Sequence, residues 1–387
     1  MGLIKKILYI INLGFKIRIY IKKPLKKKII IFDREGSGAM YYKIFAQDNI
    51  HVLDIRGESI NLYIVFLTII RLKFTLSEYI NQYIKTIKPK FIFHNSYNRR
   101  FFLIDKKDFE FNFKMIFTQS ELKNRLEFKK IFINLKKPNI DFLFVWNNGM
   151  KKFMKKIIDG KIFVTGIFLN NMRPPIKKKL LKKNICFVSQ YRPPNGDEAK
   201  IKSWTFNRRF SWLQFRKAEI DVAMQLKKYC ELKKIKFKIV GSLLDKSNDE
   251  KKFYERFLGK KNWTFLKPKK KERGMALTSH SKYIVTIDST LGYECLARGQ
   301  RVGFFCIRDN YINTNYLKFG WPNKLPLEGP CWTSKGDSKS FNRIISFLIY
   351  GAEHKWKSMK RKQLKNLITY DPSNKQYTEF LKDLRII

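Results

Sequence analysis

The sequence is poor in acidic residues. Its 387 residues include 32 Asp and Glu against 81 Lys and Arg, which gives a formal net charge of +49. Such a surface favours anionic partners, whether phospholipid headgroups, nucleotide diphosphates or nucleic acid. The lysines are spread along the whole chain and no helix-turn-helix, zinc-finger or RNP-like pattern occurs, so we do not expect nucleic acid as the partner. A compositional bias of the genome toward lysine would account for part of the excess.

Cysteine and histidine are also scarce. The cysteines are odd in number, far apart and mostly within apolar runs, which predicts reduced thiols rather than disulfides or a CxxC metal site. The histidines are scattered, so we expect no zinc site. These residues are Cys186, Cys230, Cys295, Cys306 and Cys331, and His51, His94, His280 and His354.

Long apolar runs are missing as well. Ile7–Phe15 and Ile60–Ile70 are apolar, but both fall far short of the roughly 20 residues that span a bilayer. No small-residue cleavage site follows Lys5 and Lys6, so we expect no signal peptide. Residues 1–28 alternate bulky apolar side chains with Lys and Arg, which predicts a segment lying on an anionic membrane surface. A first helix packed on the edge of a domain is the alternative.

One stretch organises the rest of the chain, Lys282–Phe305. Tyr283–Ile287 is a short β-branched run that predicts a buried strand, and Leu291–Arg298 has helical spacing. Asp288, Ser289 and Thr290 stand between them, where helix N-caps are expected, and Gly299 stands at the C-cap. With the strand Arg301–Cys306, this is the repeating unit of a doubly wound parallel sheet.

The start of that helix has a chemical consequence. Free N–H groups and the positive end of the helix dipole bind phosphate well. Glu294 falls one turn inside the helix, where its carboxylate can accept hydrogen bonds from a sugar diol beside the phosphate. An ordinary strand–helix unit with a polar cap is the alternative explanation.

The full spacing resembles a known family. Ser289-Thr290 is followed by Glu294 four residues after the Thr and by Gly299 five residues after the Glu. This pattern resembles the nucleotide-sugar site of GT-B glycosyltransferases, and IDSTLGYECLARG is similar to the bacterial surface-polysaccharide transferases of that class. The resemblance is specific over residues 262–335. It implies an α/β fold of two Rossmann-like domains that face across a cleft, with the donor diphosphate at Asp288, Ser289 and Thr290 and its ribose at Glu294.

The length suits two domains. We expect an N-terminal acceptor domain at 1–170, a linker near 168–183, where Pro174-Pro175 interrupts all periodicity, and a C-terminal nucleotide-sugar domain with terminal helices at 184–387. Strands are predicted at Lys28–Phe32, His51–Ile55, Lys90–His94, Lys114–Thr118, Phe142–Trp146, Lys161–Thr165, Asn184–Ser189, Phe237–Val240 and Trp263–Leu266; helices are predicted at Ala39–Ala46, Ile60–Leu72, Ser77–Ile87 and Trp212–Lys233.

The resemblance also suggests roles for residues at other strand ends. Arg192 follows the strand Asn184–Ser189, where such an enzyme keeps a positive group for the departing diphosphate; a solvated loop arginine is the alternative. Asp33 and Glu35 follow the first strand and His94 ends another, which makes them candidates for the catalytic base. A plain strand–turn–helix connection and a structural histidine are the alternatives.

The function expected from this reading is transfer of a sugar from a nucleotide-activated donor to a surface glycan or lipid-linked acceptor. The donor is a co-substrate, and we expect no other cofactor. No Asp-x-Asp occurs in the sequence, so we expect no metal. We expect a cytoplasmic location, peripheral at the anionic inner membrane surface. Two alternatives remain: a UDP-sugar 2-epimerase of the same architecture, and a basic, non-catalytic membrane- or nucleic-acid-binding protein on a transferase scaffold.

Overall fold

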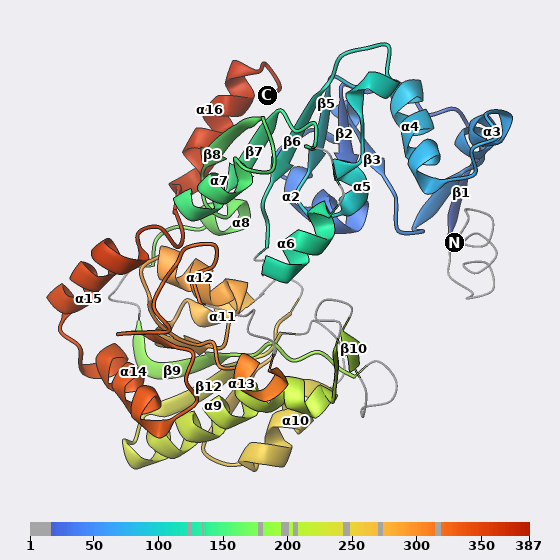
Figure 1. The fold of residues 1–387 in the computed structure, drawn as a ribbon. Coiled ribbons are helices and arrows are strands. Elements are labelled where there is room, and N and C mark those ends of the chain that lie inside the picture. The colour runs from blue at the N-terminus through green and yellow to red at the C-terminus, as the bar shows by residue number, and fades with distance from the viewer. Residues whose placement is uncertain are drawn as a thin grey trace. The chain divides into compact units, whose positions relative to one another are not determined.

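The computed structural model divides the chain into two compact units (Figure 1). Unit 1 comprises the described residues up to Glu121, Ile131–Leu169 and Asn374–Ile387, and unit 2 the described residues of Leu122–Lys130 and Asn170–Ser373. The structure describes residues 17–121, 125–133, 135, 137–176, 181–194, 201–203, 208–242, 248–269, 274–313 and 319–387. Most of the predicted basic segment 1–28 therefore lies outside the described residues.

Unit 1 is built on a six-stranded parallel sheet. The strands are β2 (Ile29–Phe32), β3 (Ile50–Leu53), β5 (Phe91–His94), β6 (Lys114–Thr118), β7 (Phe142–Val145) and β8 (Lys161–Val164), in the order β3-β2-β5-β6-β7-β8. All four residues of β2 are buried, as expected for a strand covered on both faces. The strands predicted in this unit are confirmed. Their continuous β-branched and aromatic runs suit a parallel sheet, in which both faces of a strand are buried.

The helices of unit 1 differ more from the prediction. They are α2 (Ala39–Tyr41), α3 (Leu62–Ile70), α4 (Leu76–Ile87), α5 (Arg99–Phe102), α7 (Asn148–Met154) and α8 (Phe168–Asn171), the last of which runs into unit 2, while α6 (Arg125–Phe132) spans the other boundary. The helix predicted from Ile60 begins two residues later, because Asn61 ends a short strand β4 (Ser59–Asn61) and caps the helix by accepting the N–H of Ile64 at 3.2 Å. β4 pairs in parallel with β1 (Arg18–Tyr20).

The last helix, α16 (Lys375–Asp383), belongs to unit 1. Its buried side chains join the core of the first sheet: the Tyr377 ring lies 4.5 Å from that of Phe144, and the Phe380 ring 4.9 Å from it. This differs from the expected domain of residues 184–387. The helical spacing of apolar residues shows which face of α16 is buried, but not which sheet it covers.

Unit 2 contains a seven-stranded sheet. It comprises β9 (Lys182–Val188), β12 (Lys236–Val240), β13 (Thr264–Leu266), β14 (Ser281–Thr286), β15 (Arg301–Phe305), β16 (Glu328–Gly329) and β17 (Trp332–Thr333), in the order β13-β12-β9-β14-β15-β17-β16. All neighbours are parallel except β16 and β17. A hairpin of β10 (Ile201–Ser203) and β11 (Arg208–Phe210) stands apart from this sheet.

The helices of unit 2 are α9 (Trp212–Leu232), α10 (Asp249–Leu258), α11 (Gly274–Thr278), α12 (Thr290–Ala297), α13 (Asp309–Ile312), α14 (Ser338–Tyr350) and α15 (Glu353–Met359). Both units are therefore Rossmann-like α/β folds, as expected. Among the parallel strands of each sheet the order reverses once, between β2 and β5 in unit 1 and between β9 and β14 in unit 2. Ligands of doubly wound folds bind outside the carboxyl ends of the strands at this point.

Candidate functional site

A cavity of about 590 Å³ lies in unit 2 at the carboxyl ends of its parallel strands. Its lining includes four of the predicted donor-binding residues, Arg192, Ser289, Thr290 and Glu294. They meet because β9 and β14 are adjacent and parallel, so the loops that follow them emerge at the same edge of the sheet. The structure thus brings these four residues together at one cavity, and their roles remain predictions.

Helix α12 presents its N-terminus to this cavity. Ser289 is the N-cap, and its Oγ accepts the N–H of Leu291 at 3.3 Å. The helix packs closely on β14, since a Cβ added at Gly292 would meet Thr286 Cγ2 at 2.5 Å. A glycine is required there because any side chain would push the helix away from the strand. The close packing holds the N-terminal end of α12 in place.

Two arginines that the sequence prediction missed, Arg216 and Arg308, also line the cavity. Both are buried and share one partner, Glu219: the Arg216 Nη1 donates to Glu219 Oε1 at 2.7 Å, and the Arg308 Nη2 lies 3.4 Å from the same oxygen. The Nε of each arginine has no hydrogen-bond partner among the described residues. A guanidinium has five N–H donors, so the protein partners named here do not use the full donor set of either arginine.

The signals for these two arginines differ. Arg308 follows the predicted strand Arg301–Cys306 by two residues, so the strand-end rule that selected Arg192 could have found it. Arg216 lies within α9, and nothing local shows which face of that long helix meets the cavity.

Asp288 and Arg192 have less direct roles than expected. The Asp288 carboxylate lies 3.4 Å from Arg308 Nη2, and the backbone N–H of Asp288 donates to Gln190 Oε1 at 3.4 Å. Asp288 therefore orients Arg308 and is not among the side chains that line the cavity. Arg192 is exposed at the cavity rim, where its Nη1 donates to the carbonyl of Tyr191 at 2.8 Å.

Glu294 is the carboxylate of the cavity. It is buried, and the described part of the chain offers its side chain no hydrogen bond. Burial raises its pKa from 4.5 to about 7, opposed by the charges of Arg298 and Arg173. A buried polar group without a partner is costly, so this carboxyl group is free to accept hydrogen bonds from a ligand in the cavity.

The candidates for a catalytic base lie at the strand reversal of unit 1. Asp33 is buried, with φ 70°, and its carboxylate accepts from Arg56 Nη2 at 2.6 Å and from Arg56 Nε at 2.9 Å. Burial opposes ionisation of Asp33, but hydrogen bonds from Arg56 and Gly36 lower its pKa overall. Glu35 lies 3.5 Å from Arg56, and its side chain is 69% exposed.

His94 is also fully buried, and burial lowers its pKa from 6.5 to about 4. Its Nδ1 lies 2.9 Å from both Ser37 Oγ and the carbonyl of Phe32, and Ser96 Oγ lies 3.3 Å from both His94 Nε2 and Asp33 Oδ2. The structure thus brings Asp33 and His94 into one network through Ser96. Both side chains are closed off by their partners in this state, and the assignment of Asp33, Glu35 and His94 to catalysis stays a prediction.

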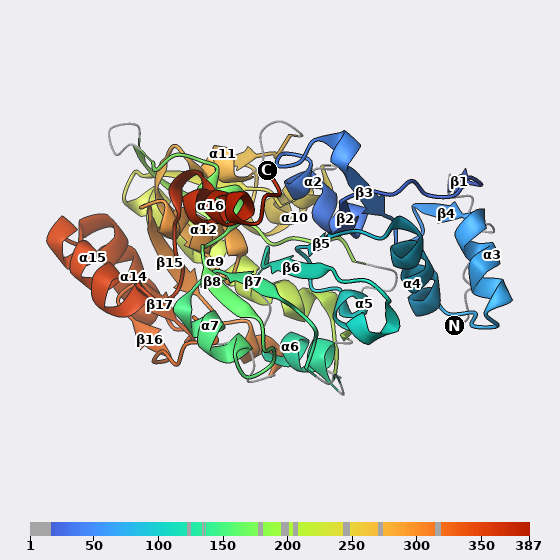
Figure 2. The ribbon, with the colours of Figure 1, turned by 90° about the horizontal axis from the view of Figure 1, so that it is seen from above.

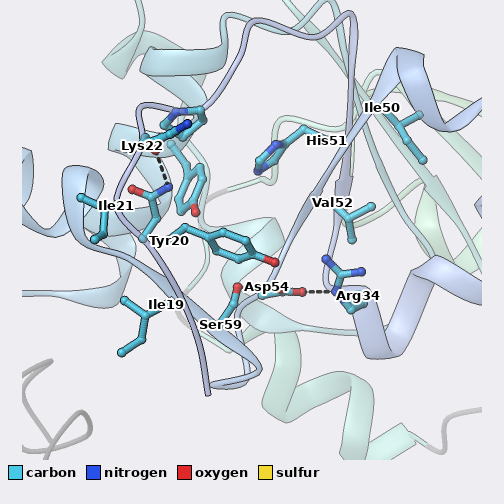
Figure 3. A pocket seen from close by; sticks show the side chains of 13 residues that line it. Ile19, Tyr20, Ile21, Lys22, Arg34, Ile50, His51, Val52, Asp54 and Ser59 are labelled. Carbon is cyan, nitrogen blue, oxygen red and sulfur yellow. Dashed lines mark hydrogen bonds and ion pairs between the residues drawn. The ribbon is translucent and has the colours of Figure 1, made fainter. Parts of the chain in front are cut away.

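Unit 1 contains a second cavity, of about 600 Å³, beside the edge strand β3 (Figure 3). In this view Arg34 and Asp54 face each other beneath Tyr20. The Arg34 Nε donates to Asp54 Oδ1 at 2.5 Å, and Ser59 Oγ donates to Asp54 Oδ2 at 2.5 Å. His51 lines the same cavity, and burial lowers its pKa to about 4. The walls are otherwise largely apolar.

The described residues contain neither a metal-binding cluster nor a membrane-spanning helix. No group of three or more His, Cys, Asp or Glu side chains is placed to hold a metal ion. No helix in the same residues has the length and apolar character that crossing a bilayer requires.

Solved structures share this architecture. A Listeria monocytogenes protein described as a "putative UDP-N-acetylglucosamine 2-epimerase" is 13% identical, with 93% of this chain and 96% of that chain covered and a TM-score of 0.51. The wall teichoic acid polymerase TagF is 14% identical, with 95% and 90% covered and a TM-score of 0.49. A Rickettsia africae glycosyltransferase is 13% identical, with 93% and 99% covered and a TM-score of 0.48.

At these identities the first similarity concerns the fold alone, and it agrees with two Rossmann-like units of the GT-B kind. No curated protein matches the sequence. A family model described as "putative O-antigen biosynthesis protein" matches residues 116–385. The match covers more than half of the chain and includes the whole cavity of unit 2. The chain therefore belongs to this family of O-antigen biosynthesis proteins, within the surface-polysaccharide class that its site motif resembles.

Proposed function

We propose that this protein is a glycosyltransferase that binds a nucleotide-sugar donor in the cavity of unit 2. One observation carries the proposal: a helix N-terminus, two buried arginines and a buried carboxylate without a hydrogen-bond partner in the described chain line one cavity. The cationic groups suit a diphosphate, and the carboxylate suits a vicinal diol. A nucleoside diphosphate contains both groups a few bonds apart.

Each residue has a chemical task in this proposal. Cleavage of the sugar–phosphate bond leaves negative charge on the diphosphate, which fixed donors stabilise most effectively. The N-terminus of α12 at Ser289 and Thr290 supplies amide N–H groups, while Arg308, Arg216 and the rim residue Arg192 supply charge. Glu294 would accept hydrogen bonds from the ribose hydroxyls and so fix the nucleotide in register. This set stabilises the leaving group without a metal.

The acceptor and the catalytic base are assigned to unit 1. The base would come from the predicted set Asp33, Glu35 and His94, of which Glu35 is exposed as the structure stands. Membership of the O-antigen family supports a growing surface glycan or a lipid-linked saccharide as the acceptor. Such acceptors lie at the inner face of the cytoplasmic membrane, which is where we place the protein as a peripheral enzyme.

A UDP-sugar 2-epimerase would use the same nucleotide pocket, but it also needs several acid–base carboxylates beside the sugar. Of the described side chains that line the cavity, Glu294 is the one carboxylate. The carboxylates of Glu219 and Asp288 are not part of the cavity lining and are paired with Arg308. In the cavity of unit 2 Glu294 is therefore the one described carboxylate available for such chemistry, and an epimerase would have to draw further groups from unit 1.

A panel of nucleotide sugars tests the proposal. A nucleotide sugar that binds the folded state should raise the melting temperature, and the best ligand should then be hydrolysed slowly or transferred to an acceptor. Glu294→Gln should weaken binding, while Glu255→Gln, which alters a surface carboxylate paired with Lys251, should not. Inversion at C2 of the sugar would establish the epimerase instead, and the absence of binding by every donor would leave a non-catalytic scaffold.

A further inference from the structure

Exposed apolar side chains gather at one end of unit 1. Of the twenty large hydrophobic residues that are exposed in the described chain, ten lie in residues 19–25 and 62–74. They are Ile19, Tyr20, Ile21, Leu25, Leu62, Phe66, Ile69, Ile70, Leu72 and Phe74. We call residues 18–26 and 62–74 together the α3 face. In both views α3 lies at the outer end of unit 1, beside β1 and β4, and α4 separates it from the six-stranded sheet (Figures 1 and 2).

Helix α3 (LYIVFLTII) is apolar on nearly every side, and part of this apolar surface is exposed. Its exposed residues Leu62, Phe66, Ile69 and Ile70 recur at i, i+4, i+7 and i+8, so they form a single stripe. Its buried residues are Ile64 and Thr68, on another side of the helix. A surface helix of a water-soluble domain normally exposes its polar stripe. Here the apolar stripe is exposed, which predicts contact with something other than water.

The charges on the α3 face are of one sign. Residues 18–26 and 62–74 contain no Asp or Glu, and the exposed basic residues among them are Arg18, Lys22, Lys23, Lys26, Arg71 and Lys73. Aliphatic groups flanked by cations match the surface of an anionic bilayer, where apolar side chains enter the acyl boundary and Lys and Arg contact the headgroups.

The same charges argue against self-association. A two-fold contact between copies would place this basic set opposite itself, and like charges across an interface repel.

We propose that the α3 face docks on an anionic phospholipid bilayer, with α3 lying in the interfacial plane. This inference does not depend on the sugar-transfer proposal, and it differs from the sequence expectation, which placed the anchor in residues 1–28 alone. Ile19, Tyr20, Ile21 and Lys22 belong to both the α3 face and the 600 Å³ cavity of unit 1, so that cavity would open beside the membrane.

Vesicle sedimentation tests the proposal with the full chain. The protein should sediment with vesicles of equal parts phosphatidylcholine and phosphatidylglycerol, and not with phosphatidylcholine alone. Binding should fall steeply toward about 1 M salt, where the screening length shrinks to about 3 Å. Phe66→Glu with Leu72→Asp should weaken binding by about tenfold or more, since it places charge in the acyl boundary.

The chain offers a matched control. Two exposed leucines each have two basic neighbours in sequence: Leu72 in Arg71-Leu72-Lys73 and Leu232 in Leu232-Lys233-Lys234. Leu72 is 80% exposed and Leu232 is 76% exposed. Leu72→Asp should reduce vesicle binding, and Leu232→Asp should leave it unchanged. An equal effect of the two substitutions would show general charge attraction and overturn the proposal.

A depth probe distinguishes insertion from surface attraction. All five native cysteines are buried, so Phe66→Cys or Leu232→Cys can be labelled with an environment-sensitive dye at one position. The dye at residue 66 should brighten and shift to the blue with anionic vesicles, and the dye at residue 232 should not. If the Phe66→Glu, Leu72→Asp variant bound vesicles fully and deletion of residues 1–16 abolished binding, the anchor would lie in residues 1–16 and the proposal would be overturned. Dimerisation through residue 66 without lipid, or no vesicle binding at all, would also overturn it.

Discussion

The guanidinium of Arg308 lies 4.3 Å from the centre of the Phe215 ring. This contact holds the group against a ring of the cavity wall, while its Nη2 donates to Gln190 Oε1 at 3.0 Å. A side chain held on its face and at one end has little conformational freedom left to lose when an anion binds. Arg308 is therefore held in place at the cavity wall, as the proposed phosphate contact requires.

The first prediction concerns this stacked arginine. Arg308→Lys should weaken binding of UDP or of the preferred nucleotide by about tenfold to a hundredfold, because an ammonium group can neither stack flat nor form a two-pronged contact with phosphate. Isothermal titration calorimetry measures the loss. Arg256→Lys is the control, since Arg256 lies 5.5 Å from the Phe257 ring on the surface helix α10 and does not line the cavity. Equal affinities for the two variants would remove Arg308 from the site.

The second prediction concerns stability and the Glu294 carboxyl. Its folded pKa is raised from 4.5 to about 7, so the folded state holds a proton that the unfolded state has lost over that window. Its contribution to stability is fully present below about pH 4.5 and is lost as pH rises to about 7. At pH 8 the Glu294→Gln protein should therefore be more stable than the parent, with a free energy of unfolding higher by up to about 3 kcal/mol. At pH 4.5 the two proteins should have similar stabilities.

Denaturant midpoints of the two proteins at both pH values check this result, with Glu255→Gln as the reference for a surface carboxylate. A Glu294→Gln protein less stable than the parent at both pH values would show that the carboxylate is held by structural contacts instead of being kept for a ligand.

The third prediction concerns ligand binding by the same carboxyl. A diol donates hydrogen bonds to the ionised form, so nucleotide affinity should rise between pH 6 and pH 8 and level off above the folded pKa of about 7. Binding near pH 7 should release a proton, which calorimetry detects as an enthalpy that depends on the buffer. In Glu294→Gln both effects should disappear. Persistence of the pH dependence in the variant would assign it to another group, such as a phosphate of the ligand.

The fourth prediction concerns the packing of α12. Gly292→Ala should destabilise the protein by about 1–3 kcal/mol, although alanine is the better helix former, because its Cβ would meet Thr286 Cγ2 at 2.5 Å and Phe304 Cε1 at 3.1 Å. Adding Thr286→Ser removes the first methyl and keeps the hydroxyl that accepts the Ser289 N–H. The double variant should regain part of the loss. Thermal unfolding measures both, and independent, additive effects would contradict the contact.

The fifth prediction concerns the position of α16. Tyr377 is almost fully buried in the core of unit 1, so Tyr377→Ala should cost about 3–5 kcal/mol. Hydrogen exchange should accelerate in β7, whose Phe144 contacts Tyr377, and nucleotide binding by unit 2 should be retained. Tyr350→Ala, which removes an exposed ring on α14, serves as the control. Faster exchange in β14 and β15 instead would place α16 with unit 2.

Much of the donor cavity follows from local pattern. The run Tyr283–Ile287 and the cap Ser289-Thr290 lie where the sequence predicts them, as β14 and the start of α12. Arg192 joins them because alternation of strands and helices implies a parallel sheet, and a parallel sheet gathers its strand ends at one edge. Glu219 and Arg216 were missed because a helix such as α9 has several apolar stretches, and its contacts depend on packing.

The surroundings of the candidate catalytic bases could not be predicted from the sequence. Asp33 and His94 lie at strand ends as predicted, but their closure by Arg56, Ser37 and Ser96 depends on side chains up to 63 positions apart in sequence. No local pattern encodes such contacts.

By itself the sequence determines the strands of the two parallel sheets and the capped turn at Ser289-Thr290, because strand runs, caps and helical spacing are local properties of neighbouring residues. The tertiary structure alone decided which sheet α16 covers, which arginines reach the cavity and which carboxylate stays unpaired there. It also decided that Leu62, Phe66 and Ile69 form the exposed side of α3, since the helix is apolar on nearly every side. The reason is physical: periodicity specifies a face, and only packing against distant residues specifies what that face meets.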